Sequence, residues 1–169
     1  MKAGVALGSN LGDRFSYLRA ARKGIAALEG VVLPILASPI YETDPIDCEP
    51  GATNFLNAVV EFTYQGEVLE LFDKLKQLEI AFGRPSSHKR NVSRPIDADL
   101  LYFGDMTLKS ERLTLPHPRI EGRKFVLAPL ADIRPELVLP GQTDTIRELL
   151  ASLPQSGKVV RLTHEWDAP

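Results

Sequence analysis

The chain has 169 residues, of which 44% are hydrophobic and 25% charged, and its net charge is −2. These values fit one folded domain, residues 1–169, and exclude a largely disordered chain. The chain has no long run of charges of one sign, so its charge pattern does not indicate nucleic-acid binding. The only cysteine, Cys48, excludes an internal disulfide and a cysteine-based structural zinc site.

No apolar run approaches the roughly 18 residues that a membrane span requires. The N-terminal segment MKAGVALGSNLGDR lacks the longer apolar region and cleavage site of a signal peptide. We therefore expect a soluble, cytoplasmic protein with no membrane contact.

The first half of the chain predicts a strand, a helix and two further extended segments. The apolar run that ends at Gly8 indicates a buried strand, and the GSNLGD turn offers Asn10 or Asp13 as a helix cap. A helical stripe of apolar residues follows over 15–28 and ends at Gly30. The segment VVLPILASPIYET is extended, and Pro34 predicts an edge or interrupted strand.

The second half begins with FLNAVVEFTY at 55–64, which predicts a strand with one clean apolar face. Residues 67–82 have the spacing of an amphipathic helix, and 96–103 predict another strand. Beyond Gly104 we expect a short strand pair around Thr107 and Leu113, helices near 124–133 and 145–150, and a possible strand in the tail.

This order is β-α-β-β-α-β, which predicts an α+β, ferredoxin-like domain: an antiparallel sheet with two helices on one face, plus C-terminal strand and helix additions. Loops or a ligand should then cover the other, open face. Asn57, Asp97 and Asp99 lie off the most apolar faces of their strands, so we place all three on that open face.

Asp97 and Asp99 stand two residues apart in an otherwise apolar strand, so both point to one face, about 6.6 Å apart along the backbone. At an effective dielectric of about 20, two such charges repel by roughly 2.5 kcal/mol. A solvated strand face paired with nearby bases is one interpretation. A site for magnesium, which prefers one or two carboxylates together with substrate phosphates, is the other.

The loop before this strand is basic, with Arg84, His88, Lys89, Arg90 and Arg94 within eleven residues. A solvated basic loop is the ordinary interpretation. However, bases followed at once by paired carboxylates also suit a polyphosphate that is held by arginines and bridged by metal. Arg94, three residues from Asp97, could enter the same site.

Six segments in register resemble the 6-hydroxymethyl-7,8-dihydropterin pyrophosphokinase family of the folate pathway. The resemblance covers roughly residues 3–135, through these segments: ALGSNLGDR, YETDP, NFLNAVV, LEIAFGR, RPIDADLLYFG and LTLPHPRIEGRKFVLAPL. It departs from the family at Ser86, Asn91 and Asp44.

The resemblance implies transfer of the pyrophosphoryl group of ATP to the pterin alcohol, with release of AMP. It implies that Asp97 and Asp99 hold two magnesium ions and act catalytically together with Arg84 and Arg94. It implies ATP contacts by Glu79, Arg84, Arg94, Leu100, Arg112, Thr114, His117 and Arg123. It implies pterin contacts by Thr43, Asp44, Ile46, Phe55, Asn57 and Phe125. The partners would be these small molecules, and we expect a monomer.

Two other classes stay open. In a metal-dependent nucleotide hydrolase on the same fold, water would replace the pterin, and Phe55 and Phe125 would be core residues. In a non-enzymatic ferredoxin-like binding module, the acid pair would merely be solvated.

Overall fold

The computed structural model describes residues 1–45, 50–83, 94–154, 157–162 and 166. In chain order its elements are β1 Lys2–Ser9, α1 Arg14–Ala26, β2 Val31–Ala37, β3 Tyr41–Thr43, β4 Phe55–Tyr64, α2 Val68–Ala81, β5 Asp97–Phe103, β6 Leu108–Lys109, β7 Thr114–Leu115, α3 Lys124–Ile133, α4 Ile146–Ser152 and β8 Val159–Arg161. The predicted elements are all present, and the tail does add a strand.

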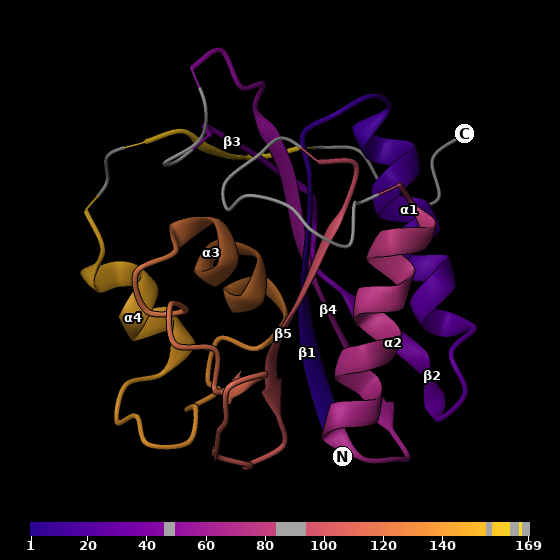
Figure 1. Cartoon of the computed structure of the whole chain (residues 1–169). Coiled ribbons are helices and arrows are strands. Elements are labelled where there is room, and N and C mark those ends of the chain that lie inside the picture. Colours follow the sequence, from indigo (N-terminus) through magenta and orange to yellow (C-terminus); the bar gives the residue numbers. More distant parts are fainter. Residues whose placement is uncertain (46–49, 84–93, 155–156, 163–165, 167–169) are drawn as a thin grey trace.

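A mixed α/β architecture results, with an antiparallel sheet of six strands (Figure 1). The strands follow the order β5-β1-β4-β3-β8, and β2 pairs with β4 beside β3. The register between β2 and β4 shifts between Val32 and Leu36, around Pro34, which confirms the predicted interrupted edge strand. Asp13 caps α1 by accepting a hydrogen bond from the backbone N–H of Ser16 at 3.0 Å.

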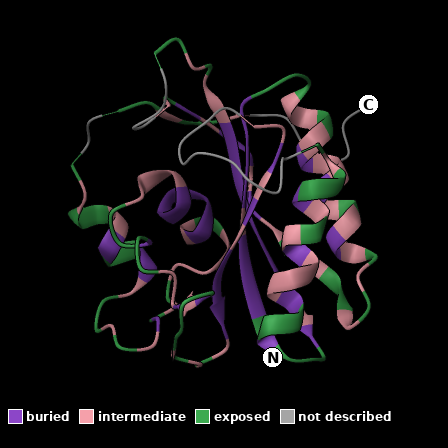
Figure 2. Ribbon diagram, viewed as in Figure 1, coloured by how far each residue is buried: buried purple, intermediate pink, exposed green. Residues whose placement is uncertain are grey.

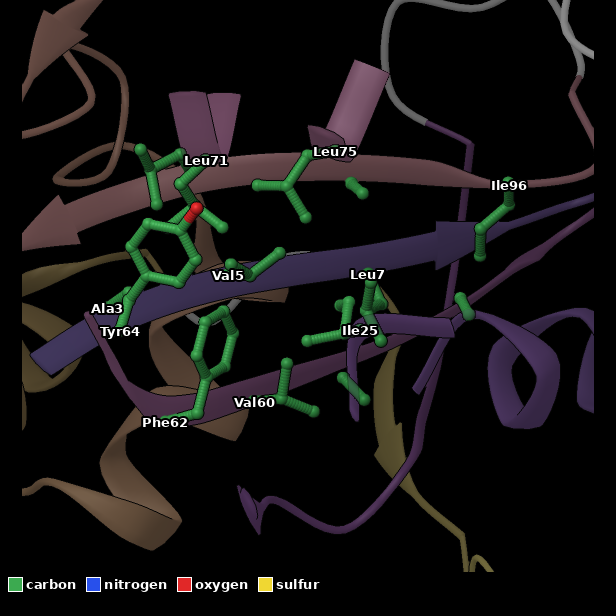
Figure 3. Close-up of a cluster of buried hydrophobic side chains, with 14 of the residues drawn as sticks. Ala3, Val5, Leu7, Ile25, Val60, Phe62, Tyr64, Leu71, Leu75 and Ile96 are labelled. Carbon is green, nitrogen blue, oxygen red and sulfur yellow. The ribbon is translucent and has the colours of Figure 1, made fainter. Parts of the chain in front are cut away.

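Helices α1 and α2 lie together on one face of the sheet and enclose the larger hydrophobic cluster, here called the α1–α2 cluster. Figure 3 shows its centre, where strand residues such as Val5, Leu7 and Phe62 point toward Ile25 of α1 and Leu71 of α2. All five side chains are at most 1% exposed, and fully burying each stabilises the fold by roughly 1.5–3 kcal/mol.

The opposite face is not the open surface that we expected from the sequence. Helix α3 packs against this face and α4 packs on α3. Together they enclose a second cluster, the α3–α4 cluster, with the buried residues Val59, Leu101, Tyr102, Ile120, Val126, Leu127, Leu130, Leu139, Ile146 and Leu149. Figure 2 accordingly shows a buried sheet between two partly exposed layers. The expectation that loops or a ligand cover this face was wrong for the part under α3 and α4, because apolar residues after Gly104 form these two helices and so add a third layer.

A β-bulge in β5 decides which of its residues meet each layer. The pairing with β1 shifts between Gly4 and Val5, so that Leu101 is the extra residue of the strand. Leu101 and the next residue, Tyr102, consequently both join the α3–α4 cluster, whereas Leu100 joins the α1–α2 cluster.

In the part of the chain that the structure describes, no helix combines the length and the apolar character needed to cross a membrane.

Candidate active site

A cavity of about 480 Å³ lies at the end of the sheet where β1 finishes and where β4 and β5 begin. The start of α3 borders it on the side of the α3–α4 cluster. It is lined by the following residues that were predicted as site residues from the sequence: Thr43, Asp44, Phe55, Asn57, Arg94, Asp97, Asp99, Arg123 and Phe125. Side chains from four separate segments therefore meet in one hollow.

Asp97 and Asp99 share one face of β5, as their spacing predicts. Asp97 pairs with Gly8 of β1, and Asp99 pairs with Ala6. Both partners are small and also line the cavity, so the space over the two carboxylates stays free. The Asp97 and Asp99 side chains keep 21% and 32% exposure, which leaves their oxygens accessible.

Glu79 of α2 brings a third carboxylate close to the two aspartates, although it does not itself line the cavity. Oxygens of Glu79, Asp97 and Asp99 all lie within 4.8 Å of one another. Glu79 accepts a hydrogen bond from the backbone N–H of Ala98 at 2.7 Å, so it fixes the residue between the two aspartates. Because β5 is an edge strand of the sheet, a helix residue can reach around it to this point.

Three cations accompany the three acids. Arg94 Nε lies 3.6 Å from Asp97 Oδ2, and Arg123 Nη1 lies 3.8 Å from Asp99 Oδ2. Lys76 Nζ is 3.0 Å from Glu79 Oε1 and 3.7 Å from Asp99 Oδ1. These charges offset the repulsion between the carboxylates. Lys76 was not predicted, because on α2 it reads as one of several solvent-facing charges between the apolar residues.

Burial and neighbouring charges shift the pKa values of several groups here. Burial, and then the charge of Asp97, raise the pKa of Glu79 despite the opposing effect of Lys76. Burial lowers the pKa of His117, and Arg123 and Arg119 lower it further, against the opposing effect of Asp99. His117 is therefore neutral at pH 7. Burial also lowers the pKa of Arg123, although a guanidinium stays charged in proteins.

The donor set fits magnesium. Carboxylate oxygens are hard ligands, and Mg²⁺ is commonly bound by one or two of them together with water and phosphate oxygens. Asp97 and Asp99 reach into the cavity, whereas Glu79 is only 3% exposed and is already held by Ala98. The first two are thus the ligands that a bound ion would meet, and the third orients the strand that carries them.

The other end of the cavity is aromatic and amide-lined. Phe55 of β4 and Phe125 of α3 both line it, and the guanidinium of Arg123 lies 5.5 Å from the Phe125 ring centre. Asn57 is only 7% exposed and donates a hydrogen bond from Nδ2 to Thr43 Oγ1 at 2.7 Å. This bond orients the amide, so that its oxygen and remaining N–H serve the cavity.

Not every predicted residue reaches this cavity. Leu100 is 3% exposed and packs in the α1–α2 cluster, so its side chain does not border the hollow. Arg112 is largely exposed and forms an ion pair with Asp73, and Thr114 lies in β7. His117 donates its backbone N–H to Leu101 O at 2.8 Å, and its Nδ1 accepts from the Arg119 N–H at 3.2 Å.

Seven residues of the sequence hypotheses lie outside the described residues: Ile46, Arg84, Ser86, His88, Lys89, Arg90 and Asn91. Their predicted roles stay predictions.

Asn10 holds two parts of the site together, a role that the sequence did not predict. Its Oδ1 accepts the backbone N–H of Arg94 at 2.8 Å, and its own N–H donates to Arg94 O at 3.3 Å. Thr53 donates its hydroxyl to the Asn10 carbonyl. Asn10 is only 1% exposed, and a buried amide needs hydrogen-bond partners. In the sequence, the available signal for this role was an asparagine within the GSN turn.

Comparison with known proteins now bears on this site. A model of the 7,8-dihydro-6-hydroxymethylpterin-pyrophosphokinase (HPPK) family matches residues 4–135. The 2-amino-4-hydroxy-6-hydroxymethyldihydropteridine pyrophosphokinase of Bacillus subtilis is 43% identical over 131 residues, which cover 76% of this chain and 75% of the relative. That of Methylorubrum extorquens is 38% identical over 159 residues, which cover 92% and 96%.

A solved structure of Plasmodium falciparum HPPK-DHPS with pterin and p-hydroxybenzoate has a TM-score of 0.69 at 17% identity. The match covers 89% of this chain but only 42% of that longer one, so the likeness concerns the fold of one part of it. Taken with the relatives of similar length, these matches show that the chain belongs to the 7,8-dihydro-6-hydroxymethylpterin-pyrophosphokinase family.

Proposed function

We propose that the cavity holds a hydroxymethyl dihydropterin at its aromatic end and the triphosphate of ATP at its carboxylate end. The chain is a pyrophosphokinase of folate synthesis, and ATP is its co-substrate. One observation carries the assignment of the two ends: the two aspartates with their two arginines, and the two phenylalanines with Asn57, line a single cavity.

At the carboxylate end, Asp97 and Asp99 would hold two magnesium ions in our proposal. Bound magnesium would neutralise the charge of the triphosphate. Arg94 and Arg123 are each paired loosely with one aspartate, at 3.6 and 3.8 Å. Their forked guanidinium groups suit phosphate oxygens, to which they would turn when ATP binds. Arg84 and His117 complete the phosphate contacts in this proposal.

At the aromatic end, the flat pterin would stack between Phe55 and Phe125. The Asn57 side chain offers a hydrogen-bond acceptor and a hydrogen-bond donor, which matches the edge of a pterin ring, where donors and acceptors both occur. Its bond to Thr43 fixes its orientation before the substrate arrives. Asp44 and Ile46 would border the same ring.

The contribution of the chain to the reaction is then alignment and charge stabilisation. The aromatic end fixes the alcohol, and the cations fix the phosphate chain. Glu79, Arg112, Thr114 and the backbone at Leu100 would serve the nucleoside side, along the outer edge of β5.

Three broader features belong to the same proposal. The order β5-β1-β4-β2 with antiparallel neighbours supports a ferredoxin-like βαββαβ core. We further propose a monomer that acts in the cytoplasm and contacts neither nucleic acid nor membrane. Sedimentation velocity tests the oligomeric state.

The activity is tested by incubating the protein with ATP, magnesium and 6-hydroxymethyl-7,8-dihydropterin, and by separating the nucleotide products. We expect AMP and pyrophosphorylated pterin in equal amounts. Release of ADP or free phosphate would identify a hydrolase or an ordinary kinase instead. Pterin fluorescence gives the second measurement, since a hydrolase with Phe55 and Phe125 as core residues would leave it unchanged.

A further inference from the structure

The C-terminal strand β8 pairs with β3, the strand that brings Thr43 to the cavity, although β8 lies beyond the residues that match the family. It pairs with β3 so that Val159 is opposite Thr43 and Val160 is opposite Glu42. Figure 1 shows this yellow strand beside β3 at the upper end of the sheet. A segment remote in sequence thus supports the wall that carries Thr43 and Asp44.

Lys158, the residue just before β8, contacts this wall in three ways. Its backbone N–H donates to Asp44 Oδ2 at 2.9 Å, and its carbonyl accepts the Asp44 N–H at 3.2 Å. Its ammonium donates to Glu42 Oε2 at 2.7 Å. Asp44 lines the cavity, so Lys158 fixes both the backbone and the carboxylate of a cavity residue.

Glu42 extends this connection to the neighbouring strand β4, which pairs directly with β3 so that Thr43 is opposite Phe55. The other carboxylate oxygen of Glu42 accepts from Arg14 Nη1 at 3.2 Å, and the same Arg14 nitrogen donates to the carbonyl of Asn54 at 2.8 Å. Asn54 precedes Phe55. Hydrogen bonds from Lys158 and from Arg14 lower the pKa of Glu42, which keeps the carboxylate charged between its two cations.

We infer that Lys158 is a positioning residue for the pterin: it holds Asp44 against the cavity, and through Glu42 and Arg14 it connects this segment to Asn54, next to Phe55. This inference rests on the proposed assignment of the aromatic end. Lys158 itself does not line the cavity and touches no reacting group. Its substitution therefore changes pterin affinity and leaves ATP binding and the chemical step unaltered.

The decisive comparison is between Lys158→Glu and Arg161→Glu. Both change the net charge equally, lie at β8 and replace an exposed side chain, but Arg161 pairs with Asp132, at 3.7 Å, whereas Lys158 pairs with Glu42. Lys158→Glu places a negative charge against Glu42 and Asp44. We expect it to raise the KM for the pterin about tenfold, with kcat and the KM for ATP within about twofold.

Arg161→Glu should change the KM for the pterin less than about twofold, and Lys158→Arg should restore the wild-type value. Direct titration of pterin fluorescence, and thermal melting of each variant, accompany the kinetics. If Lys158→Glu does not fold, Lys158→Gln replaces it, with an expected increase of about threefold in the KM for the pterin.

Equal increases in the two Glu variants, or a Lys158 variant that loses only thermal stability, would overturn the inference. So would a parallel increase in the KM for ATP. A wild-type protein that fails to bind the pterin would instead overturn the proposed function, so the two failures are distinguishable.

Discussion

Asp97 and Asp99 face Gly8 and Ala6 across the β1–β5 pairing, so the two charged residues have the smallest neighbours of the sheet opposite them. The sequence predicted that the aspartates share a face, because alternation along a strand fixes this. It did not predict Lys76 or Glu79 as their neighbours, since a helix packed beside an edge strand places side chains there through tertiary contacts alone.

Asp97→Asn and Asp99→Asn preserve shape and remove one metal-binding charge each. We expect either change to lower turnover by about 100-fold or more, because charge at the transferring phosphates would no longer be held. Initial rates at saturating magnesium measure the effect, and circular dichroism checks the fold. Asp105→Asn, an exposed residue beyond β5, is the control. Near-wild-type rates in either site variant would refute the metal assignment.

Gly8 forms the floor of the cavity beneath Asn57. A methyl group at this position would lie 3.1 Å from Asn57 Oδ1, so that Gly8→Ala displaces the amide. We expect the KM for the pterin to increase about three- to tenfold and the KM for ATP to increase less, because the methyl group would lie 4.0 Å from Asp97 Cβ, an ordinary contact. Steady-state kinetics measure both. Gly122→Ala is the matched control, since Gly122 also lines the cavity but has open space around a methyl group.

At the scale of elements, α3 connects the site to the lower part of the molecule. It starts beside the cavity with Phe125 and ends at Arg134, which caps the helix. Two nitrogens of the Arg134 guanidinium donate hydrogen bonds to Glu61 of β4. Nη2 lies 2.5 Å from Oε1, and Nε lies 3.0 Å from Oε2. Tyr102 also donates its hydroxyl to Glu61 at 2.7 Å. Alternation along a strand assigns Glu61 a face, but it does not identify Arg134, which lies 73 residues away in the sequence.

The Glu61–Arg134 contact gives folding stability a definite pH dependence. Burial alone would raise the pKa of Glu61, but hydrogen bonds from Arg134 and Tyr102 outweigh it and lower the pKa below the usual 4.5. A lowered folded-state pKa means that the contribution is present above pH 4.5 and is lost as the pH falls below it.

Glu61→Gln should therefore lower the free energy of unfolding at pH 7 by about 1–3 kcal/mol, and the difference from wild type should shrink toward pH 3. Urea unfolding at both pH values measures this. Glu136→Gln, which removes an exposed partner of Arg147, should cost less than about 0.5 kcal/mol at either pH. A difference for Glu61→Gln that stays constant with pH would argue against a charged Glu61.

Across the whole molecule, local signals predicted the elements and their order, and six short motifs predicted the family. Positions such as Asp97, Asn57 and Phe125 could be assigned because each lies in such a motif. The third layer of α3 and α4 was misjudged, because apolar helices after the core indicate burial but not the face on which they pack. Lys158 was missed for a related reason: β8 meets β3 only after the chain has crossed the molecule.

The bulge at Leu101 has a practical consequence for anyone who redesigns β5. Odd-numbered positions from Asp97 to Leu101 face the layer that contains α3. Beyond the bulge, the even-numbered Tyr102 faces this layer, and Phe103 faces the α1–α2 cluster. An odd–even rule for choosing polar and apolar substitutions therefore changes phase within a seven-residue strand. Libraries that randomise one parity throughout would mix cavity residues with residues of the α1–α2 core, and the two segments need separate rules.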